Sequence, residues 1–452
     1  MYQPYSYKLF KILPNASMIF FIFLIGCQKD ILDSYDASTF ILDFSIKSSI
    51  QDQATLSIKT GQDAEVYIMM QEIGQISPSK DQIMAAVQPS GKEAIKKDKV
   101  NTKANQEMTV EVKNFPKYKS FDFYLLAIHN SGNFQIRNLS LRNKTETIIE
   151  GLKNLPEVFS FIVSEKGSTV IEKYFNGFND STIADSRSMQ KGILSLLTGI
   201  AIEKGFFKLN TTLGEYIPLK YNHLMDDQKR SITVEHFLTM TTGLGGLESE
   251  FNQWVQKPDE IVDVLERPMR AKPGVLFDYS TPNLHLLAVI FQEATKMTVH
   301  DFAKKYLFEP LGIFKSEWIL FETGYSGPLI YLQTKDYLKI GEMVMNRGIF
   351  QSKKMINTDY VDQMLMKRNT PNGVYATSGL TGDRFGYLWW GLDRKDIKGF
   401  ATIGYGGQYI WVIPEKEVVV AINSKTRNVL AVQTVHLTNL QKIMSDFVDS
   451  LN

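Results

Sequence analysis

Ser188 and Lys191 are the residues whose types and spacing most directly indicate chemistry. They stand three positions apart in Ser188-Met189-Gln190-Lys191, at the start of a long apolar stretch. On a helix, residues at this spacing share a face with Cβ atoms about 5–6 Å apart, so the amine lies within reach of the hydroxyl. A serine becomes an effective nucleophile when an adjacent base removes its proton. The spacing therefore predicts covalent catalysis through Ser188, and an N-capping serine beside a surface lysine is the alternative explanation.

The apolar segment after Lys191 is the element that must position this pair. Residues 192–202 are apolar on nearly every helical face, and Gly205 suits a helix C-terminal cap. A lysine at the mouth of a buried helix loses hydration, which lowers its pKa and frees it to act as a base. A second copy of the spacing, from Ser77 to Lys80, contains a proline, so there we expect a surface turn leading into a short helix.

The composition of the chain argues against several classes of function. The chain has 452 residues, of which 44% are hydrophobic and 22% charged, as in ordinary globular proteins with two or three domains. Its formal net charge of +1 gives no electrostatic argument for nucleic-acid binding. The six histidines are scattered and there is one cysteine, so no zinc-ligand pattern appears. We therefore expect neither a metal nor an organic cofactor.

The N-terminus carries an export pattern. Lysines precede the apolar run 18–26, which is followed at once by Cys27. A basic start and a short apolar core are typical of a signal peptide, and the run is too short to span a bilayer. The segment Leu24-Ile25-Gly26-Cys27 resembles a bacterial lipobox. We expect residues 1–27 to be a lipoprotein signal ending at a lipidated Cys27. The protein would then be exported and lipid-anchored in the bacterial envelope, at the outer membrane and facing either the periplasm or the surface. An uncleaved N-terminal anchor is the alternative.

Two patterns follow along the chain. Residues 36–142 contain short alternating strands separated by turn residues, which predict an all-β sandwich that resembles immunoglobulin or fibronectin type III modules. No catalytic constellation appears there, so we expect a spacer or a module that binds an envelope or glycan partner. Residues 143–155 are polar and are interpreted as a linker.

Residues 156–452 predict an α+β domain. A hairpin signal lies at Ser164–Gly167, a long helical stretch occupies the middle, and strands return near 407–422 before a final amphipathic helix. Strands at both ends of a helical middle indicate an antiparallel sheet flanked by helices, with a helical insertion on one side.

Two further segments complete a constellation with Ser188-Met189-Gln190-Lys191. Tyr279-Ser280-Thr281 lies in the helical middle, and Gly404–Gln408 opens a C-terminal strand. In this order the three segments resemble those of the serine β-lactamase and penicillin-binding superfamily, in its class C-like esterase and amidase branch. Segments at 232–244, 308–312 and 385–390 match that branch in the same order. The resemblance covers about residue 156 to the C-terminus and implies a β-lactamase/transpeptidase-like fold.

The resemblance implies a role for each matching residue. Ser188 would be the nucleophile, Lys191 its general base and Tyr279 a proton shuttle. The oxyanion would be bound by the backbone N–H groups of Ser188 and Gln408, the first of which lies at the positive end of a helix dipole. The residues implied in substrate binding are Thr281, Tyr405, Gly406 and Gly407.

Two departures from the family pattern point to the substrate class. Thr281 stands where lactamases often carry asparagine, and Tyr405 stands where lactamases and carboxypeptidases carry a lysine that recognises a substrate carboxylate. A neutral phenol in place of a fixed positive charge favours hydrolysis of other small-molecule or peptide-like esters and amides. A weak β-lactamase or a peptidoglycan D,D-peptidase is the alternative enzyme. A non-catalytic binding or scaffold protein is the alternative from another class.

Overall fold

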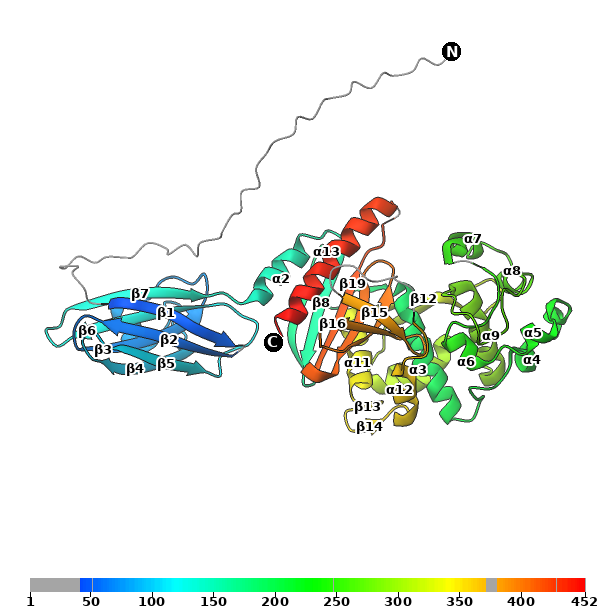
Figure 1. Cartoon of the computed structure of the whole chain (residues 1–452), viewed down its shortest axis with the longest axis horizontal. Helices are drawn as coiled ribbons and strands as arrows, with labels where there is room; N and C mark the ends of the chain where they lie inside the picture. The colour runs from blue at the N-terminus through cyan, green and yellow to red at the C-terminus, as the bar shows by residue number, and fades with distance from the viewer. Residues whose placement is uncertain (1–40, 51, 247, 371–379, 428, 452) are drawn as a thin grey trace, which may run out of the picture. The chain divides into compact units, whose positions relative to one another are not determined.

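The computed structural model in Figure 1 divides into two compact units, one built mainly from the strands between Ile41 and Leu141 and one built mainly from the chain after Arg142. The residues that the structure describes are 41–50, 52–246, 248–370, 380–427 and 429–451. Cys27 and the expected signal segment lie outside these ranges. Within them, no helix is both long and apolar enough to cross a bilayer.

The first unit is a separate β domain, as predicted. A three-stranded sheet has the order β1-β2-β5, and a four-stranded antiparallel sheet has the order β4-β3-β6-β7. The strands are β1 (Ile41–Ile50), β2 (Gln53–Thr60), β3 (Ala64–Glu72), β4 (Lys96–Thr102), β5 (Glu107–Lys113), β6 (Phe121–His129) and β7 (Phe134–Leu141). The second copy of the serine–lysine spacing lies here, where Ser79 caps helix α1 (Lys80–Ala85) and Ser77 is exposed. It has the turn-to-helix structure that the sequence predicts.

The second unit is organised around a seven-stranded antiparallel sheet. Its order, β15-β16-β17-β18-β19-β8-β9, places the strands from the start of the unit beside those from its end. The strands are β8 (Val158–Glu165), β9 (Ser168–Tyr174), β15 (Leu380–Phe385), β16 (Trp390–Arg394), β17 (Phe400–Gly404), β18 (Gln408–Ile413) and β19 (Val418–Ser424). The predicted hairpin joins β8 to β9, and Lys166 and Gly167 both have positive φ there, as a tight two-residue turn requires.

Strand register shows which helices cover which face of this sheet. Thr402 of β17 pairs directly with Ile410 of β18, so their side chains lie on the same face of the sheet. Helix α3 (Gln190–Glu203) contacts Thr402 on this face, and Gly341 of helix α11 (Thr334–Met345) contacts Ile410. Phe161 lies on the opposite face and makes an edge-to-face contact with Phe447 of helix α13 (Leu430–Asp449). The sheet therefore has α3 and α11 on one face and α13 on the other.

The predicted linker is instead part of the second unit. Residues 144–153 form helix α2 (Lys144–Lys153), capped by Asn143, and its Ile148 and Leu152 are buried in the same core as the sheet. The polar composition of this stretch belongs to the exposed face of an amphipathic helix. Three large apolar residues in ten, Ile148, Ile149 and Leu152, were too few to distinguish this helix from a loop.

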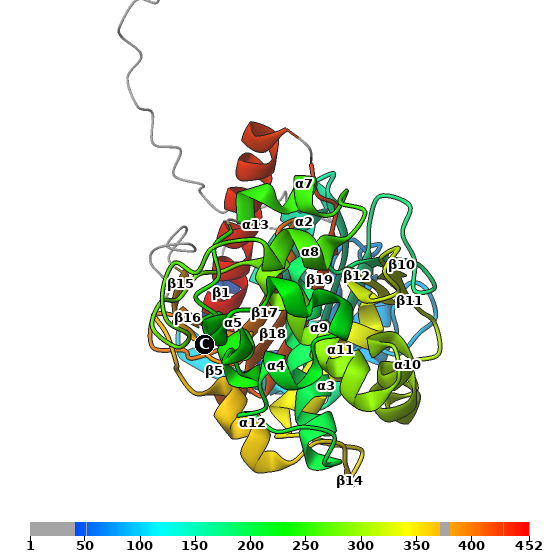
Figure 2. The same ribbon diagram turned by 90° about the vertical axis from the view of Figure 1, so that its right-hand side faces the viewer.

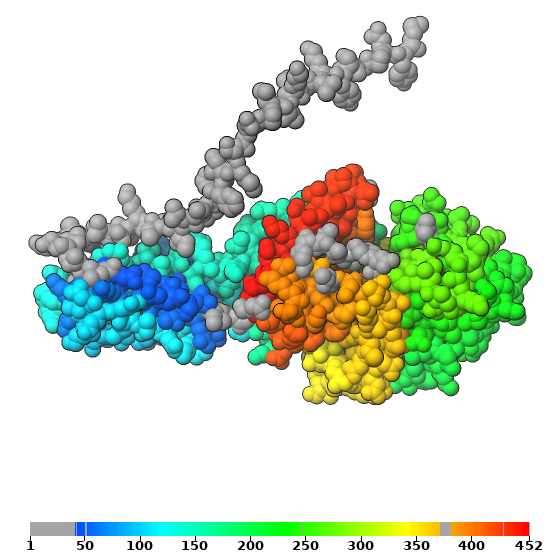
Figure 3. All heavy atoms as spheres, in the orientation of Figure 1, coloured from blue at the N-terminus to red at the C-terminus, as the bar shows by residue number. Residues whose placement is uncertain are grey.

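The helical insertion comes from the middle of the sequence of the second unit. Figure 2 looks onto this part, and Figure 3 shows its segments packed against those of the sheet-bearing part. Its helices are α4 (Leu213–Tyr216), α5 (Asp227–Arg230), α6 (Val234–Leu238), α7 (Phe251–Trp254), α8 (Glu260–Leu265), α9 (Thr281–Thr295) and α10 (Val299–Ala303), and α12 (Thr358–Leu365) follows α11. Three shorter strands, β10 (Ile183–Asp185), β11 (Ser316–Leu320) and β12 (Ser326–Gln333), form a sheet of order β10-β12-β11, and β13 (Ile349–Phe350) pairs with β14 (Lys353–Lys354).

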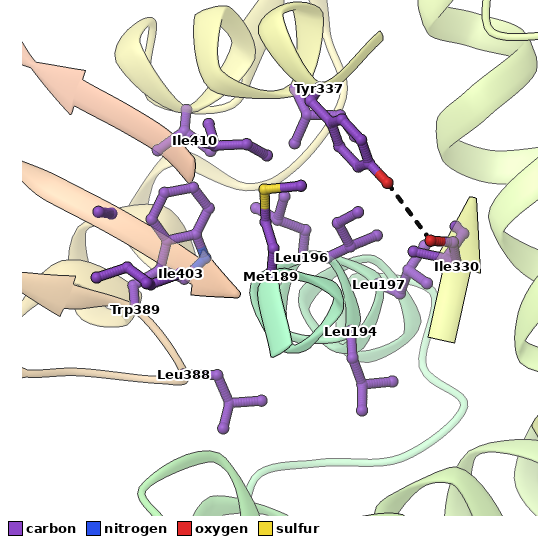
Figure 4. Close-up of a cluster of buried hydrophobic side chains, with 14 of the residues drawn as sticks. Met189, Leu194, Leu196, Leu197, Ile330, Tyr337, Leu388, Trp389, Ile403 and Ile410 are labelled. Carbon is purple, nitrogen blue, oxygen red and sulfur yellow. Dashed lines mark hydrogen bonds between the residues drawn. The ribbon is translucent and has the colours of Figure 1, made fainter. Parts of the chain in front are cut away.

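Helix α3 lies at the centre of the core, as its apolar sequence predicts. Met189, Leu196 and Leu197 are fully buried around it, and Figure 4 shows them between the sheet side chains and Tyr337. Gly192 lets the helix approach the sheet, because a Cβ there would lie 2.7 Å from the Thr402 side chain. The helix that presents Ser188 is therefore held on all sides by packing.

Candidate active site

Ser188 and Lys191 are in direct contact. Ser188 lies in a 3₁₀ turn, η1 (Arg187–Met189), which continues directly into α3. The Lys191 Nζ lies 2.8 Å from the Ser188 Oγ, a hydrogen-bond distance. Ser188 is partly exposed whereas Lys191 is only 3% exposed. A substrate can therefore reach the hydroxyl while the amine behind it is shielded from water.

Burial sets the proton affinity of the lysine. Loss of hydration lowers the pKa of Lys191 from 10.5 to about 8, and the negative charge of Glu248 opposes that shift. The amine also lies 5.1 Å from the centre of the Tyr279 ring. A lysine with this pKa is in part neutral near physiological pH, which is what a general base for Ser188 needs.

Tyr279 completes the predicted trio. It precedes Ser280, the N-cap of α9, and its ring packs on Trp390 and Phe385 at centroid distances of 5.7 and 6.4 Å. Burial, with a smaller effect of Glu248, raises the pKa of Tyr279, and hydrogen bonding with Ser188 acts in the opposite direction. The phenol consequently stays protonated at neutral pH. It is suited to pass a proton on as a neutral donor rather than to act as a phenolate.

The backbone just before Ser188 has an unusual conformation that the sequence did not reveal. Arg187 has a φ of +45°, in the left-handed region that side chains rarely adopt. The Asp185 carboxylate accepts the Arg187 N–H at 2.7 Å and pairs with its guanidinium at 2.8 Å. These contacts hold the conformation that turns the chain from β10 into the 3₁₀ turn. Strain of this kind is concentrated at functional sites.

The glycine-rich segment forms a turn beside Ser188. Residues 405–407 connect β17 to β18, and both strands contact the 3₁₀ turn that carries Ser188. A Cβ on Gly404 would lie 2.6 Å from the Ser186 carbonyl oxygen, so the two backbones approach closely there. Gln408 is the first residue of β18. The fold thus brings the backbone segments of Ser188 and Gln408, the two predicted oxyanion donors, next to each other.

A set of buried polar side chains holds this turn in place. The Gly406 carbonyl accepts from Ser424 Oγ at 2.5 Å and lies 3.0 Å from His436 Nε2, while Gln433 Nε2 donates to the Tyr405 carbonyl at 3.0 Å. The Gln408 side chain accepts the Gly406 N–H at 2.9 Å. Ser424, Gln433 and His436 were not among the residues predicted from the sequence. A signal was present, since Gln433 and His436 lie three apart on the buried face of the final helix.

The Thr281 site differs from the substrate contact expected there. Both the backbone N–H and the hydroxyl of Thr281 donate to the Glu248 carboxylate, at 2.6 and 2.7 Å. Thr281 is buried, and Glu248, which begins the 3₁₀ turn η3 (Glu248–Glu250), is partly exposed. Glu248 lies in a loop without a readable pattern, so nothing in the sequence indicated it.

A family comparison agrees with this geometry. A model of the Beta-lactamase family matches residues 152–440, which is more than half of the chain. The chain belongs to the β-lactamase family. It is a member of a family of serine hydrolases, and the second unit has the β-lactamase/transpeptidase-like fold.

This β-lactamase family member is similar to one curated protein over a short segment and to two solved structures over most of the second unit. Protein flp of Staphylococcus aureus (strain MW2) is 28% identical over 123 residues, which cover 25% of this chain and 24% of that protein. The chain therefore matches about a quarter of the length of this curated relative. A penicillin-binding protein homologue from Caulobacter crescentus has a similar fold, with a TM-score of 0.52, 13% identity and coverage of 68% of this chain and 97% of that one. EstCE1, a hydrolase with promiscuous acyltransferase activity, has a TM-score of 0.51 and 12% identity, covering 66% and 96%.

Within this family member, the predicted site residues fall into three groups. Ser188, Lys191 and Tyr279 meet at one point, and the turn of Gly406 and Gly407 lies against the same 3₁₀ turn. The Tyr405 side chain is half exposed and Thr281 is bound to Glu248, as described above. In the described ranges, no group of three His, Cys, Asp or Glu side chains is arranged to hold a metal ion.

Proposed function

We propose that the protein hydrolyses ester or amide substrates through an acyl-enzyme on Ser188. The observation that carries the proposal is the 2.8 Å contact between Ser188 Oγ and a buried lysine amine whose pKa burial lowers to about 8. Burial makes Lys191 a base near neutral pH, and the hydroxyl beside it is accessible to substrate. The proposal agrees with the structural neighbours, which include a penicillin-binding protein homologue and a hydrolase with promiscuous acyltransferase activity.

The proposed reaction has two halves. In acylation, Lys191 takes the proton of Ser188, the serine oxygen bonds to the substrate carbonyl carbon, and the backbone N–H groups of Ser188 and Gln408 stabilise the oxyanion. The proton then passes through Tyr279 to the departing alcohol or amine as its bond to the carbonyl breaks. In deacylation, water attacks the acyl carbon, gives its proton to the same pair and releases the acid, which regenerates the Ser188 hydroxyl.

Substrate preference follows from Tyr405. A half-exposed neutral phenol occupies the position where a lysine would bind a substrate carboxylate, and the chain therefore lacks that charge at this position. Loss of a charge-assisted hydrogen bond typically weakens binding by about 1.5–3 kcal/mol. We expect neutral or cationic esters and amides to be better substrates than β-lactams or carboxylate-terminated peptides.

A covalent probe and two chromogenic substrates test this function. A fluorophosphonate should label the purified protein, and Ser188→Ala should abolish the label, whereas Ser77→Ala, in the other copy of the spacing, should not. Equal labelling of the Ser188→Ala variant would refute an enzyme and favour a binding or scaffold role. A higher kcat/KM for nitrocefin than for a p-nitrophenyl ester would instead favour the β-lactamase or D,D-peptidase alternative.

We further propose that Cys27 is lipidated, that it anchors the protein in the bacterial envelope, and that the first unit is a spacer or binds an envelope partner. The support is the basic start with Lys8 and Lys11, the short apolar run and the small residue before Cys27. Mass spectrometry of the mature N-terminus should detect a lipid-modified cysteine, and Cys27→Ser should release the protein from membranes. A Cys27→Ser variant that remains membrane-bound would contradict lipid anchoring.

A further inference from the structure

Glu248 places a carboxylate next to the reacting groups. It comes from η3 in the helical insertion and meets Thr281, two residues after Tyr279, at the N-terminus of α9. Its negative charge adds to the raised pKa of Tyr279 and opposes the lowering of the Lys191 pKa by burial. Glu248 is thus close to both residues that move protons in the proposed mechanism, yet it is no part of that mechanism.

The side chains of Glu248 and Thr281 offer hydrogen-bond acceptors to a substrate on this side of the site. Glu248 Oε1 accepts the Thr281 hydroxyl and Oε2 accepts the Thr281 N–H. Because a carboxylate oxygen has two acceptor sites, each oxygen retains one. The Thr281 hydroxyl has its proton committed to Glu248 and retains acceptor capacity as well. An asparagine at position 281 would offer an amide N–H₂; this pair offers acceptors.

Charge complementarity points in the same direction. Within the described ranges, no lysine, arginine or histidine forms an ion pair with Glu248; Arg267 of the neighbouring segment pairs with Glu250 and Asp263. Glu248 is partly exposed and so remains accessible. The charge of Glu248 acts on the buried Lys191, but the two form no ion pair, so a ligand amine would supply the direct cationic partner that this carboxylate lacks among the described residues.

We propose that Glu248 selects substrates that carry a protonated amine close to the scissile ester or amide bond. The inference rests on the proposed acyl-enzyme function and gives it a substrate class, namely amino-acyl or amine-bearing esters and amides. Glu248 acts as a specificity residue: it accepts the ammonium hydrogen bonds while Thr281 fixes the carboxylate. A substrate with a carboxylate in the same place is repelled.

Four phenyl esters test the proposal, with release of the phenol as the readout. Phenyl propionate is the neutral reference. Phenyl alaninate, in both enantiomers, places the amine on the acyl side, and 4-(aminomethyl)phenyl propionate places it on the leaving side. The kcat/KM of each amine-bearing ester is divided by that of the reference, for the wild type, Glu248→Gln and Glu250→Gln. This ratio cancels any effect of Glu248 on Lys191, because both substrates use the same base.

We expect Glu248→Gln to lower the ratio about 10-fold or more for at least one amine-bearing ester, the size of a lost hydrogen bond to a charged group. Glu250→Gln removes a carboxylate from the same turn, and its ratios should match the wild type. Unchanged ratios in Glu248→Gln, together with normal fluorophosphonate labelling of Ser188, overturn the role of Glu248 alone. Absence of both labelling and turnover in the wild type overturns the proposed function and this inference with it.

Discussion

The pH dependence of Ser188 acylation is the sharpest test of the site. The base must be neutral to accept a proton, so the acylation rate follows the deprotonated fraction of Lys191. A pKa of about 8 leaves about one amine in ten neutral at pH 7, compared with about one in 3,000 for the ordinary value of 10.5. Burial of this side chain therefore increases the reactive fraction about 300-fold at pH 7.

The assay is the second-order rate of fluorophosphonate labelling between pH 6 and 10, with Ser188→Ala as the background. Below pH 7 the rate should rise about 10-fold per pH unit, and it should level off above about pH 9. Tyr279 does not titrate in this window, because its pKa is raised from an already high value. Lys191→Arg should reduce the rate nearly to background, since a guanidinium stays protonated.

A Glu248 variant tests the direction in which this carboxylate shifts the pKa of Lys191. Glu248 stabilises the protonated lysine, so Glu248→Gln should move the midpoint of the profile to lower pH, while Glu250→Gln leaves it in place. A rate that is already constant from pH 6 upward, or one that still rises 10-fold per unit at pH 10, would show that a buried Lys191 is not the base.

Three further substitutions test other parts of the site. Tyr405→Lys restores a positive charge where the phenol is half exposed, and it should lower the KM for nitrocefin about 10-fold while leaving the KM for a neutral ester unchanged. Gln433→Ala removes the hydrogen bond to the Tyr405 carbonyl and should reduce kcat about 10-fold with little change in KM. The control is the adjacent Thr434→Ala, on the exposed side of the same helix, which should leave kcat unchanged. An equal loss of kcat in Thr434→Ala would contradict a specific role of Gln433 in holding the turn. Gly192→Ala forces a Cβ to within 2.7 Å of Thr402 and should lower the free energy of unfolding by about 1–3 kcal/mol in urea denaturation, whereas an unchanged midpoint would mean that the helix shifts freely on the sheet.

Local sequence signals predicted much of this fold. The apolar run after Lys191 gave the buried helix, and alternating strands gave the separate β domain. The segment interpreted as a linker contains helix α2, which buries a narrow stripe, Ile148 and Leu152, in an otherwise polar stretch. A stripe this narrow becomes recognisable once the surface that covers it is known.

The candidate site was predictable where chemistry lies on one short segment or matches a known order of motifs. The contact between Ser188 and Lys191 follows from their three-residue spacing at the start of a helix whose apolar sequence predicts burial. Glu248 was not predictable, because it binds Thr281, a residue that only the tertiary fold brings near. Asp185 binds Arg187, two residues along the chain, but a single acidic side chain carries no spacing signature of its own. Their roles became visible with the hydrogen bonds.

Helix α13 has a consequence for how activity depends on folding. The nucleophile and its base are neighbours on one turn, and they form as soon as α3 does. The turn beside them comes from β17 and β18, and its carbonyls are held by Gln433 and His436 of a helix that follows both strands in sequence. A truncation before α13 would keep the hydroxyl and amine together but release the oxyanion turn. Covalent labelling of Ser188 therefore also reports whether this last helix has docked.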